Sequence, residues 1–229
     1  MLDDDAREFT ERRLNLVLCD SLEGITQRRA QDRVRHWLES TATGTRGASY
    51  VPRRTKGFGR KVLYLDFDGV LHHEDVRWQP KRGAYLQDES FCLFEHAALL
   101  DQMLAPFHDL DVVLSTSWVR TYSCHHSAMR LPAGLRRRVI GATFHSAMDR
   151  AEFALLSRGQ QVYADVVRRR PAEWFALDDV DEGWPNPLRE HIVLTDPILG
   201  ITSSAAIRGI QANLARLYPA KPGSLDFKL

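Results

Sequence analysis

The apolar run Val62–Leu65 is followed directly by Asp66-Phe67-Asp68-Gly69, so two carboxylates emerge two residues apart where a buried strand should end. Carboxylates do not stay buried in a strand without partners. At the carboxyl end of a parallel strand they would lie where ligands of open α/β sheets bind. A hard divalent cation with oxygen ligands would relieve the repulsion between them. The pattern therefore predicts a cation-dependent site, although Asp and Gly are also common turn residues.

The elements that must position these carboxylates follow from Gly59 onward, where short apolar runs alternate with amphipathic stretches. The runs are Val62–Leu65, Val112–Leu114, Val139–Gly141, Trp174–Leu177 and Ile192–Leu194. The stretches with helical spacing lie near residues 95–106, 118–130, 159–170 and 203–217. Strands that alternate with helices predict an α/β domain with a mostly parallel sheet and helices on both faces.

Residues 1–58 have a different character. Ala6–Cys19 and Gln27–Ser40 carry helical spacing, and Thr41–Gly59 is rich in Thr, Gly, Ser and Arg. We expect an N-terminal helical extension and linker over 1–58, not needed for the chemistry, and a catalytic domain over 59–229.

The stretch Asp66-Phe67-Asp68-Gly69-Val70, with its apolar strand, resembles the first motif of the haloacid-dehalogenase-like (HAD) superfamily: four hydrophobic residues, DxDG and another hydrophobic residue. The resemblance implies that Asp66 is the nucleophile and forms an aspartyl-phosphate, and that Asp68 is the acid/base. A carboxylate nucleophile splits one difficult displacement into two easier steps, and a neighbouring carboxyl group can shuttle the proton. It also implies a Rossmannoid three-layer sandwich whose five-stranded parallel sheet has the order 5-4-1-2-3.

The second motif of that family is a hydrophobic strand that ends in Ser or Thr, and Val112–Leu114 leads into Ser115-Thr116-Ser117. The resemblance implies that Thr116 holds a phosphoryl oxygen, with Ser115 as an alternative. Gly69, Ser115 and Ser117 are expected to contact the substrate. Capping of the next helix by Ser117 is an alternative role that can coexist with this one.

The fourth motif is a strand that ends in paired acids, which matches Asp178-Asp179 after Trp174–Leu177. The resemblance implies that Asp66, Asp68, Asp178 and Asp179 hold Mg²⁺, with Asp179 the more direct ligand of the last pair. The alternative is a solvated acidic loop, since Asp181 and Glu182 follow.

The third motif is a single Lys or Arg that neutralises the nucleophile and the phosphate. Here the chain departs from the commoner pattern, because no lysine occurs between Lys81 and Lys221. Arg158 is the best candidate, since a guanidinium is a competent phosphate ligand. Arg150 and Arg120 are fallback choices.

Within the superfamily, the chain resembles the HAD domain associated with bacterial RNA-repair ("Swiss Army knife") proteins. The resemblance is carried by Leu-Asp-Phe-Asp-Gly-Val-Leu-His, Leu-Ser-Thr-Ser-Trp, Leu-Asp-Asp and the late Thr195-Asp196-Pro197…Gly200-Ile-Thr202. The last segment could equally be a turn that closes the fifth strand.

The gaps between the motifs are too short for a large cap domain. The segment from His72 to about Glu89 could form a small flap with Trp78 and Tyr85. An open site favours a phosphate displayed on a macromolecule, such as an RNA or DNA end or a phosphoprotein.

Other polar clusters favour ordinary structural roles. The runs Arg136–Arg138 and Arg168–Arg170, with the arm Arg53, Arg54, Lys56 and Arg60, could attract a polyanion, but triplets on a helix are more often solvated helix ends. His72 and His73 are interpreted as surface-loop residues, and Trp118 and Trp174 as core. Cys124-His125-His126 with His145 lacks the ligand spacing of a structural zinc site.

Composition restricts the class of protein. Lys and Arg number 31 and Asp and Glu number 30, so no overall charge attracts nucleic acid or a membrane. The three cysteines form no CxxC pair, no apolar run could span a bilayer and no secretory signal is evident, so a cytoplasmic protein is expected.

Together these features predict a magnesium-dependent phosphatase of HAD type. Two alternatives remain open: a catalytically quiet HAD-fold module that binds a phosphorylated partner, and a phosphotransferase that uses the same residues. The oligomeric state is not predicted.

Overall fold

The computed structural model describes residues 55–219 apart from Ala147 and Pro185, together with seven residues nearer the N-terminus: Leu2, Asp3, Val17, Leu18, Gln31, Asp32 and Arg35. The chain divides into two compact units, Met1–Arg53 and Arg54–Leu229. All remaining parts of the expected extension and linker up to residue 54 lie outside the described residues.

In the first unit, β1 (Leu2–Asp3) pairs in parallel with β2 (Val17–Leu18). The helix expected over Ala6–Cys19 is therefore wrong at Val17 and Leu18, where backbone pairing overrides the helical spacing. Asp32 lies in a helix and pairs with Arg35, as the spacing of Gln27–Ser40 predicts.

The second unit is built on a five-stranded sheet in which every pairing is parallel. Its strands are β3 (Lys61–Leu65), β6 (Leu110–Leu114), β7 (Val139–Ala142), β8 (Glu173–Asp178) and β9 (Ile192–Leu194). The strands lie in the order β7-β6-β3-β8-β9, which reads 5-4-1-2-3 from β9 when only the strands of this sheet are counted. The predicted parallel α/β architecture is confirmed.

The central strand β3 is in register with both of its neighbours, so the three strands end side by side. Leu65 is paired with Leu114 of β6 on one side and with Leu177 of β8 on the other. The residues that follow these three positions therefore emerge side by side at one edge of the sheet.

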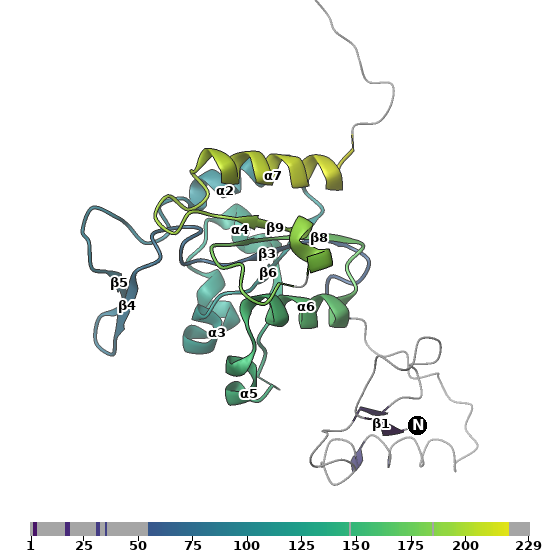
Figure 1. The fold of residues 1–229 in the computed structure, drawn as a ribbon. Coiled ribbons are helices and arrows are strands. Elements are labelled where there is room, and N and C mark those ends of the chain that lie inside the picture. Colours follow the sequence, from purple (N-terminus) through teal and green to yellow (C-terminus); the bar gives the residue numbers. More distant parts are fainter. Residues whose placement is uncertain are drawn as a thin grey trace, which may run out of the picture. The chain divides into compact units, whose positions relative to one another are not determined.

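Helices cover both faces of the sheet, with α7 on one face and α6 on the other (Figure 1). The helices of this unit are α2 (Ala97–Leu104), α3 (Trp118–Ala128), α4 (Ala133–Arg138), α5 (Arg150–Leu155), α6 (Arg158–Arg169) and α7 (Ser204–Leu217), with a 3₁₀ turn, η3 (Asn186–His191). Leu63 and Leu65 point into the apolar cluster shared with α2 and α7, whereas Val62 and Tyr64 point into the cluster shared with α6. Burial on both faces explains why β3 reads as a continuous apolar run.

A buried polar network fastens α6 to the sheet. Asp165 of α6 accepts a hydrogen bond from the Tyr64 hydroxyl at 3.1 Å and pairs with Arg169 at 2.5 Å and with Arg168. Burial and the Asp165 charge raise the pKa of Tyr64. Arg169 also donates to the carbonyl of Lys56 at 2.7 Å, which attaches the segment before β3 to this unit.

The basic triplets of the sequence are thus partly used inside the fold. Arg168 and Arg169 pair with Asp165, and Arg138 donates to the backbone carbonyls of Leu104, Phe107 and Leu110. The interpretation of both triplets as solvated helix ends is therefore wrong for these three arginines, and contact with a polyanion stays a prediction.

A two-stranded hairpin interrupts the chain between β3 and α2. β4 (Val76–Gln79) and β5 (Gly83–Leu86) pair antiparallel and belong to no other sheet. The hairpin projects from the body of the unit (Figure 1). Only a polar loop or small flap was expected here.

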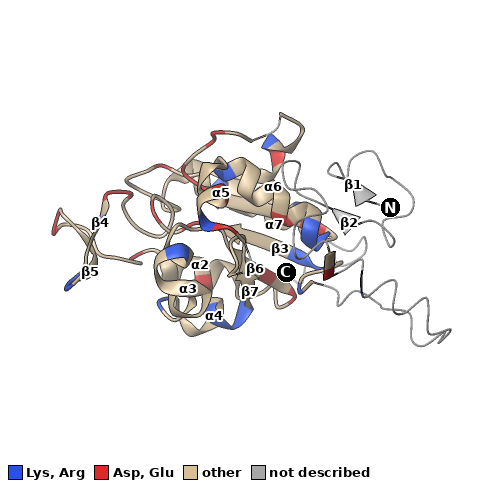
Figure 2. Ribbon diagram, turned by 90° about the horizontal axis from the view of Figure 1, so that it is seen from below, with Lys and Arg blue, Asp and Glu red and all other residues tan. Residues whose placement is uncertain are grey.

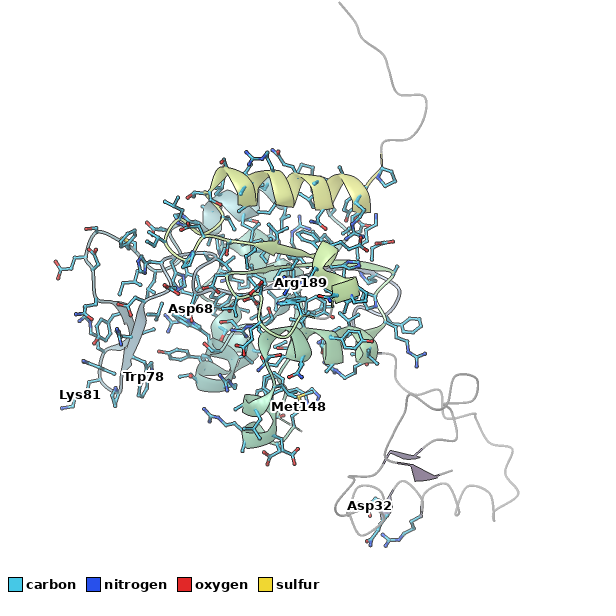
Figure 3. All side chains as sticks on the ribbon, viewed as in Figure 1. Asp32, Asp68, Trp78, Lys81, Met148 and Arg189 are labelled. Atoms are coloured by element: carbon cyan, nitrogen blue, oxygen red, sulfur yellow. The ribbon has the colours of Figure 1, made fainter. Side chains whose placement is uncertain are left out.

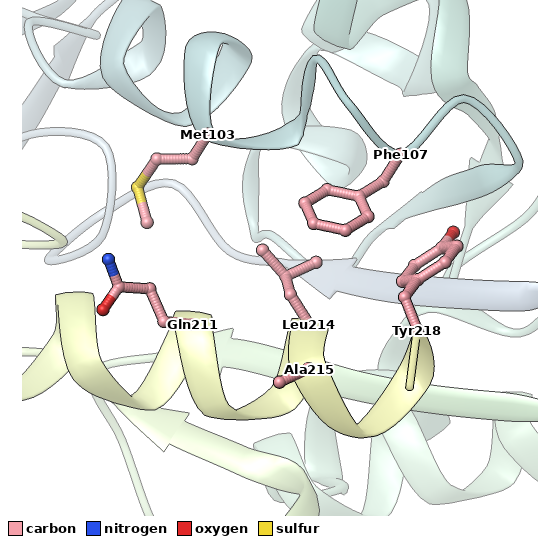
Figure 4. Close-up of a pocket in the computed structure, with 6 residues that line it drawn as sticks. All are labelled: Met103, Phe107, Gln211, Leu214, Ala215 and Tyr218. Atoms are coloured by element: carbon pink, nitrogen blue, oxygen red, sulfur yellow. The ribbon is translucent and has the colours of Figure 1, made fainter. Parts of the chain in front are cut away.

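A small apolar pocket of about 310 Å³ lies between α2 and α7 (Figure 4). It is lined by Met103, Phe107, Gln211, Leu214, Ala215 and Tyr218. Tyr218 hydrogen-bonds Asp109, which precedes β6, so this pocket lies at the amino ends of the strands. No helix in the described part of the chain is long and apolar enough to cross a membrane.

Candidate active site

Four loops meet at the carboxyl edge of the sheet because the ladder of backbone hydrogen bonds continues past the strand ends. Asp66 N–H donates to Leu177 O at 3.1 Å, and Ser115 N–H donates to Leu65 O at 2.9 Å. Thr195 N–H donates to Asp178 O at 3.0 Å. The loops after β3, β6, β8 and β9 are thereby held together, at the point where the order of the sheet reverses.

Asp66 is almost completely buried, with 2% of its surface exposed. Its Oδ1 accepts from the Phe67 backbone at 2.8 Å, and its Oδ2 lies 3.0 Å from Nη2 of Arg158. Burial raises the pKa of Asp66, the Arg158 charge opposes this, and the Asp68 charge adds to it.

Asp66, Asp178 and Asp179 offer carboxylate oxygens that all lie within 4.8 Å of one another. Burial and the Asp66 charge raise the pKa of Asp178 well above its usual value and that of Asp179 to about 6. The buried Oδ2 of Asp178 accepts no hydrogen bond. Such a set fits a hard divalent cation, because the ion would coordinate the carboxylate oxygens and reduce the repulsion among three clustered acids.

Gly69 allows this arrangement. Its φ is +64°, a conformation that favours glycine, and a Cβ at this position would lie 2.4 Å from Oδ2 of Asp179. The glycine of the DxDG pattern therefore provides both the turn and the space for the Asp179 carboxylate. Its carbonyl accepts from the Thr195 hydroxyl at 2.7 Å, which ties the loop after β9 to the nucleophile loop.

Arg158, the first residue of α6, reaches this group from the opposite side. Its Nε lies 3.3 Å from Oδ2 of Asp178, its Nη2 contacts Asp66, and its Nη1 donates to the Ser115 carbonyl. Burial lowers the pKa of Arg158, but the Asp66 and Asp178 charges raise it on balance. Helix α6 begins here because Ser157 and Gln160 form a capping box.

The two fallback arginines, Arg120 and Arg150, form no ion pair with Asp66 among the described residues. Burial and the charges of Arg158 and Arg150 lower the pKa of Arg120. Among the described ion pairs, Arg158 alone contacts Asp66. The geometry therefore supports Arg158 as the cation of the third motif.

Asp68 accepts hydrogen bonds from two side chains. Its Oδ1 is 2.7 Å from Nε1 of Trp118 and 3.0 Å from Nε2 of His72. The Phe94 backbone N–H donates to Nδ1 of His72, so Nε2 carries the proton given to Asp68. The carboxylate of Asp68 is not grouped with the other three, and its role as a metal ligand stays a prediction.

His72 and Trp118 correct two interpretations of the sequence. His72 is fully buried rather than a surface-loop residue, and Trp118 uses its indole N–H for Asp68 as well as packing in the core. The spacing Asp68-x-x-x-His72 and the tryptophan directly after Ser115-Thr116-Ser117 were the available signals, but spacing alone does not show which polar side chains turn inward.

The hydroxyl groups of the second motif also gather here. Ser115 and Thr116 are buried, and the Thr116 side chain opposes the rise in the pKa of Asp66. Ser115 Oγ is buried without a hydrogen-bond partner, which leaves it able to bind an incoming oxygen atom. Ser117 is the N-cap residue of α3, but its side chain makes no capping hydrogen bond; the Thr116 hydroxyl accepts from Trp118 N–H instead.

Two weaker candidates have structural explanations. Asp196 is exposed and accepts from the backbone of Ile198 and Leu199, as expected of a turn after the fifth strand. The segment Cys124–His126 and His145 form no metal-ligand group among the described residues, where only the three-carboxylate group qualifies.

Comparison with protein families agrees with this geometry. Residues 62–206, more than half of the chain, match the family described as "HAD domain in Swiss Army Knife RNA repair proteins". The chain belongs to this family. The matched region of this HAD domain runs from Val62 in β3 through β9 and contains every loop of the site. No curated protein and no solved structure matches the chain.

Proposed function

We propose that this HAD domain is a magnesium-dependent phosphatase that acts through an aspartyl-phosphate on Asp66. The observation that carries the proposal is a cluster of three carboxylates, Asp66, Asp178 and Asp179, of which Arg158 pairs with Asp66 and Asp178. Family membership supports a phosphatase-type hydrolase. Asp66, Asp178 and Asp179 would hold Mg²⁺, which when bound would screen the charge between the nucleophile and the phosphoryl oxygens.

In the first step, an oxygen of Asp66 attacks phosphorus in line with the leaving oxygen. Asp68 donates its proton to that oxygen as the P–O bond breaks. Since Trp118 and His72 both bind Oδ1, Oδ2 is the oxygen of Asp68 that would carry the transferable proton. Arg158, Thr116 and Ser115 would hold the equatorial oxygens; Arg158 contacts Asp66, and Ser115 Oγ is buried without a hydrogen-bond partner.

In the second step, Asp68 takes a proton from water, and the water oxygen attacks the phosphorus bound to Asp66. The Asp66–phosphorus bond breaks, and inorganic phosphate leaves. An alcohol in place of water would make the enzyme a phosphotransferase, which competition between an added alcohol and water would reveal.

The substrate is proposed to be a phosphate on a macromolecule. Between Gly69 and β6, the described chain adds only the β4–β5 hairpin and α2, and between β6 and β8 it adds four helices and β7. These insertions are small compared with a domain that closes over a metabolite. The proposal is tested by hydrolysis of an aryl phosphate with and without Mg²⁺. A protein that binds phosphate but never turns it over would favour a quiet binding module.

A further inference from the structure

The β4–β5 hairpin carries side chains that the proposed chemistry does not use. From Val76 to Leu86 it contains three basic residues, Arg77, Lys81 and Arg82, and no acidic residue. Figure 2 shows this positive charge at the end of the hairpin. Trp78 is 53% exposed, and none of the ring contacts among the described residues involves it.

The hairpin is anchored to the active site rather than hinged away from it. At its base, Glu74 N–H donates to Pro197 O at 2.9 Å, in the loop after β9. On its second strand, Ala84 N–H donates to the Tyr122 hydroxyl at 3.0 Å. The Tyr122 ring lies 5.5 Å from that of Trp118, which holds Asp68.

Strand register puts Trp78 on the face directed at the core. Trp78 is paired with Ala84, and Val76 with Leu86, so these four share one face. Val76 and Ala84 pack against the main apolar cluster, and Leu86 is buried. Trp78, one pair nearer the turn, extends this face beyond the core. Figure 3 shows Trp78 and Lys81 on the side of the core where Asp68 lies.

Two cations near the turn remain for a ligand. Arg77 is paired with Asp75 at 2.8 Å, but no ion pair is found for Lys81 or Arg82 among the described residues. The Arg82 guanidinium lies 4.0 Å from the centre of the Tyr85 ring. The stacked guanidinium and ring form a flat cationic surface in addition to the exposed Trp78 indole.

We propose that this hairpin binds a single-stranded nucleic acid whose terminal phosphate enters the Asp66 site. A base stacks on Trp78, and backbone phosphates lie beside Lys81 and Arg82. Aromatic surfaces that alternate with cations are how proteins hold single strands without reading their sequence. A phosphopeptide would use the cations but would leave the indole without a partner. The inference rests on the proposed phosphatase function for its terminal phosphate, whereas binding can be measured separately.

The test measures binding of fluorescent, end-phosphorylated single-stranded RNA and DNA hexamers to full-length protein carrying Asp66→Asn, in Mg²⁺. Adding Trp78→Ala should weaken binding by about tenfold, through loss of one stacked base. Lys81→Gln with Arg82→Gln should lower the slope of log affinity against log salt by about 1.4, from two phosphate contacts. Tyr163→Ala and Arg137→Gln, exposed residues on α6 and α4, are the matched controls and should change neither quantity.

Thermal melting of each variant checks that it is folded. Equal hexamer affinity in the Trp78→Ala protein would overturn the inference, and it would leave the phosphatase proposal intact if aryl phosphate is still hydrolysed by the wild type. Trp78-dependent binding of phosphopeptides with no binding of hexamers would overturn it in favour of a protein substrate. If hexamer binding depends on Trp78 but the wild type hydrolyses no phosphate, the proposed nucleic-acid surface is supported and the proposed phosphatase function is refuted. A preference for RNA or DNA hexamers would identify the source of the strand within the supported class.

Discussion

Nη2 of Arg158 lies 3.0 Å from Oδ2 of Asp66, although 92 residues separate them in the chain. The same guanidinium contacts Asp178 through Nε. One cation therefore balances two buried carboxylates, at the place where we propose that a phosphoryl group binds. Arg158 thus stabilises the site before substrate arrives and is available to bind its charge afterwards.

Replacement of Arg158 by Gln should lower both stability and activity. Leaving Asp66 and Asp178 buried without their cation should reduce the free energy of unfolding by about 3 kcal/mol in metal-free protein, a loss that Mg²⁺ partly restores. Loss of the phosphate contact should reduce kcat/KM by about a hundredfold or more. Denaturant unfolding and steady-state kinetics measure the two effects.

The matched control is Arg189→Gln, which breaks an exposed pair with Asp181 at 3.1 Å. This variant should lose about 1 kcal/mol or less. Similar losses in both variants would contradict the role assigned to Arg158.

Gly69→Ala should impair metal binding as well as stability. The new Cβ would overlap the Asp179 carboxylate, and the positive φ costs about 1–2 kcal/mol for a residue with a side chain. Gly59→Ala is the control, because Gly59 has a φ of +68° with nothing within 4 Å of an added Cβ. Calorimetric Mg²⁺ titration should show weakened binding for Gly69→Ala only; unchanged affinity would refute the placement of Asp179 in the metal site.

Trp118→Phe should impair proton donation by Asp68 while keeping an aromatic ring in the core. The loss should be about tenfold larger for an alkyl phosphate than for an aryl phosphate, since the poorer leaving group needs the proton. The control is Trp174→Phe, which changes a buried tryptophan near the amino end of β8. It should lower the rates for both substrates equally. Equal losses for both substrates in the Trp118 variant would mean that its hydrogen bond to Asp68 is merely structural.

Affinity for Mg²⁺ should depend on pH through Asp179. Burial and the Asp66 charge raise the pKa of Asp179 to about 6. The pKa of this carboxyl group is higher in the folded than in the unfolded protein. The free energy of unfolding of the metal-free protein therefore falls as pH rises from the pKa of the unfolded state to about 6. Mg²⁺ should therefore bind tightly above pH 6 and raise the melting temperature most there. Affinity that is constant from pH 5 to 7 would contradict this; calorimetry over the range decides.

Much of the site follows from the sequence because it lies at strand ends. Runs such as Val62–Leu65 are buried on both faces, so the change from apolar to polar residues marks where each strand ends. The polar residues that follow parallel strands lie together at the carboxyl edge of the sheet. The contacts of Asp68 do not follow, since they depend on how His72 and Trp118 turn inward. A small flap with Trp78 and Tyr85 was predicted, but the two strands of the β4–β5 hairpin were not, because Pro80 and its charged neighbours resemble a polar loop.

The measurement that tests the central claim most directly is Mg²⁺-dependent hydrolysis of an aryl phosphate by wild type, Asp66→Asn and Asp181→Asn. Asp181 is an exposed acid beyond the fourth motif, so its replacement controls for loss of a carboxylate. We predict turnover in wild type and Asp181→Asn only with Mg²⁺, and a loss of at least about a thousandfold in Asp66→Asn. Metal-dependent turnover that survives in Asp66→Asn would contradict the assignment of Asp66 as the nucleophile.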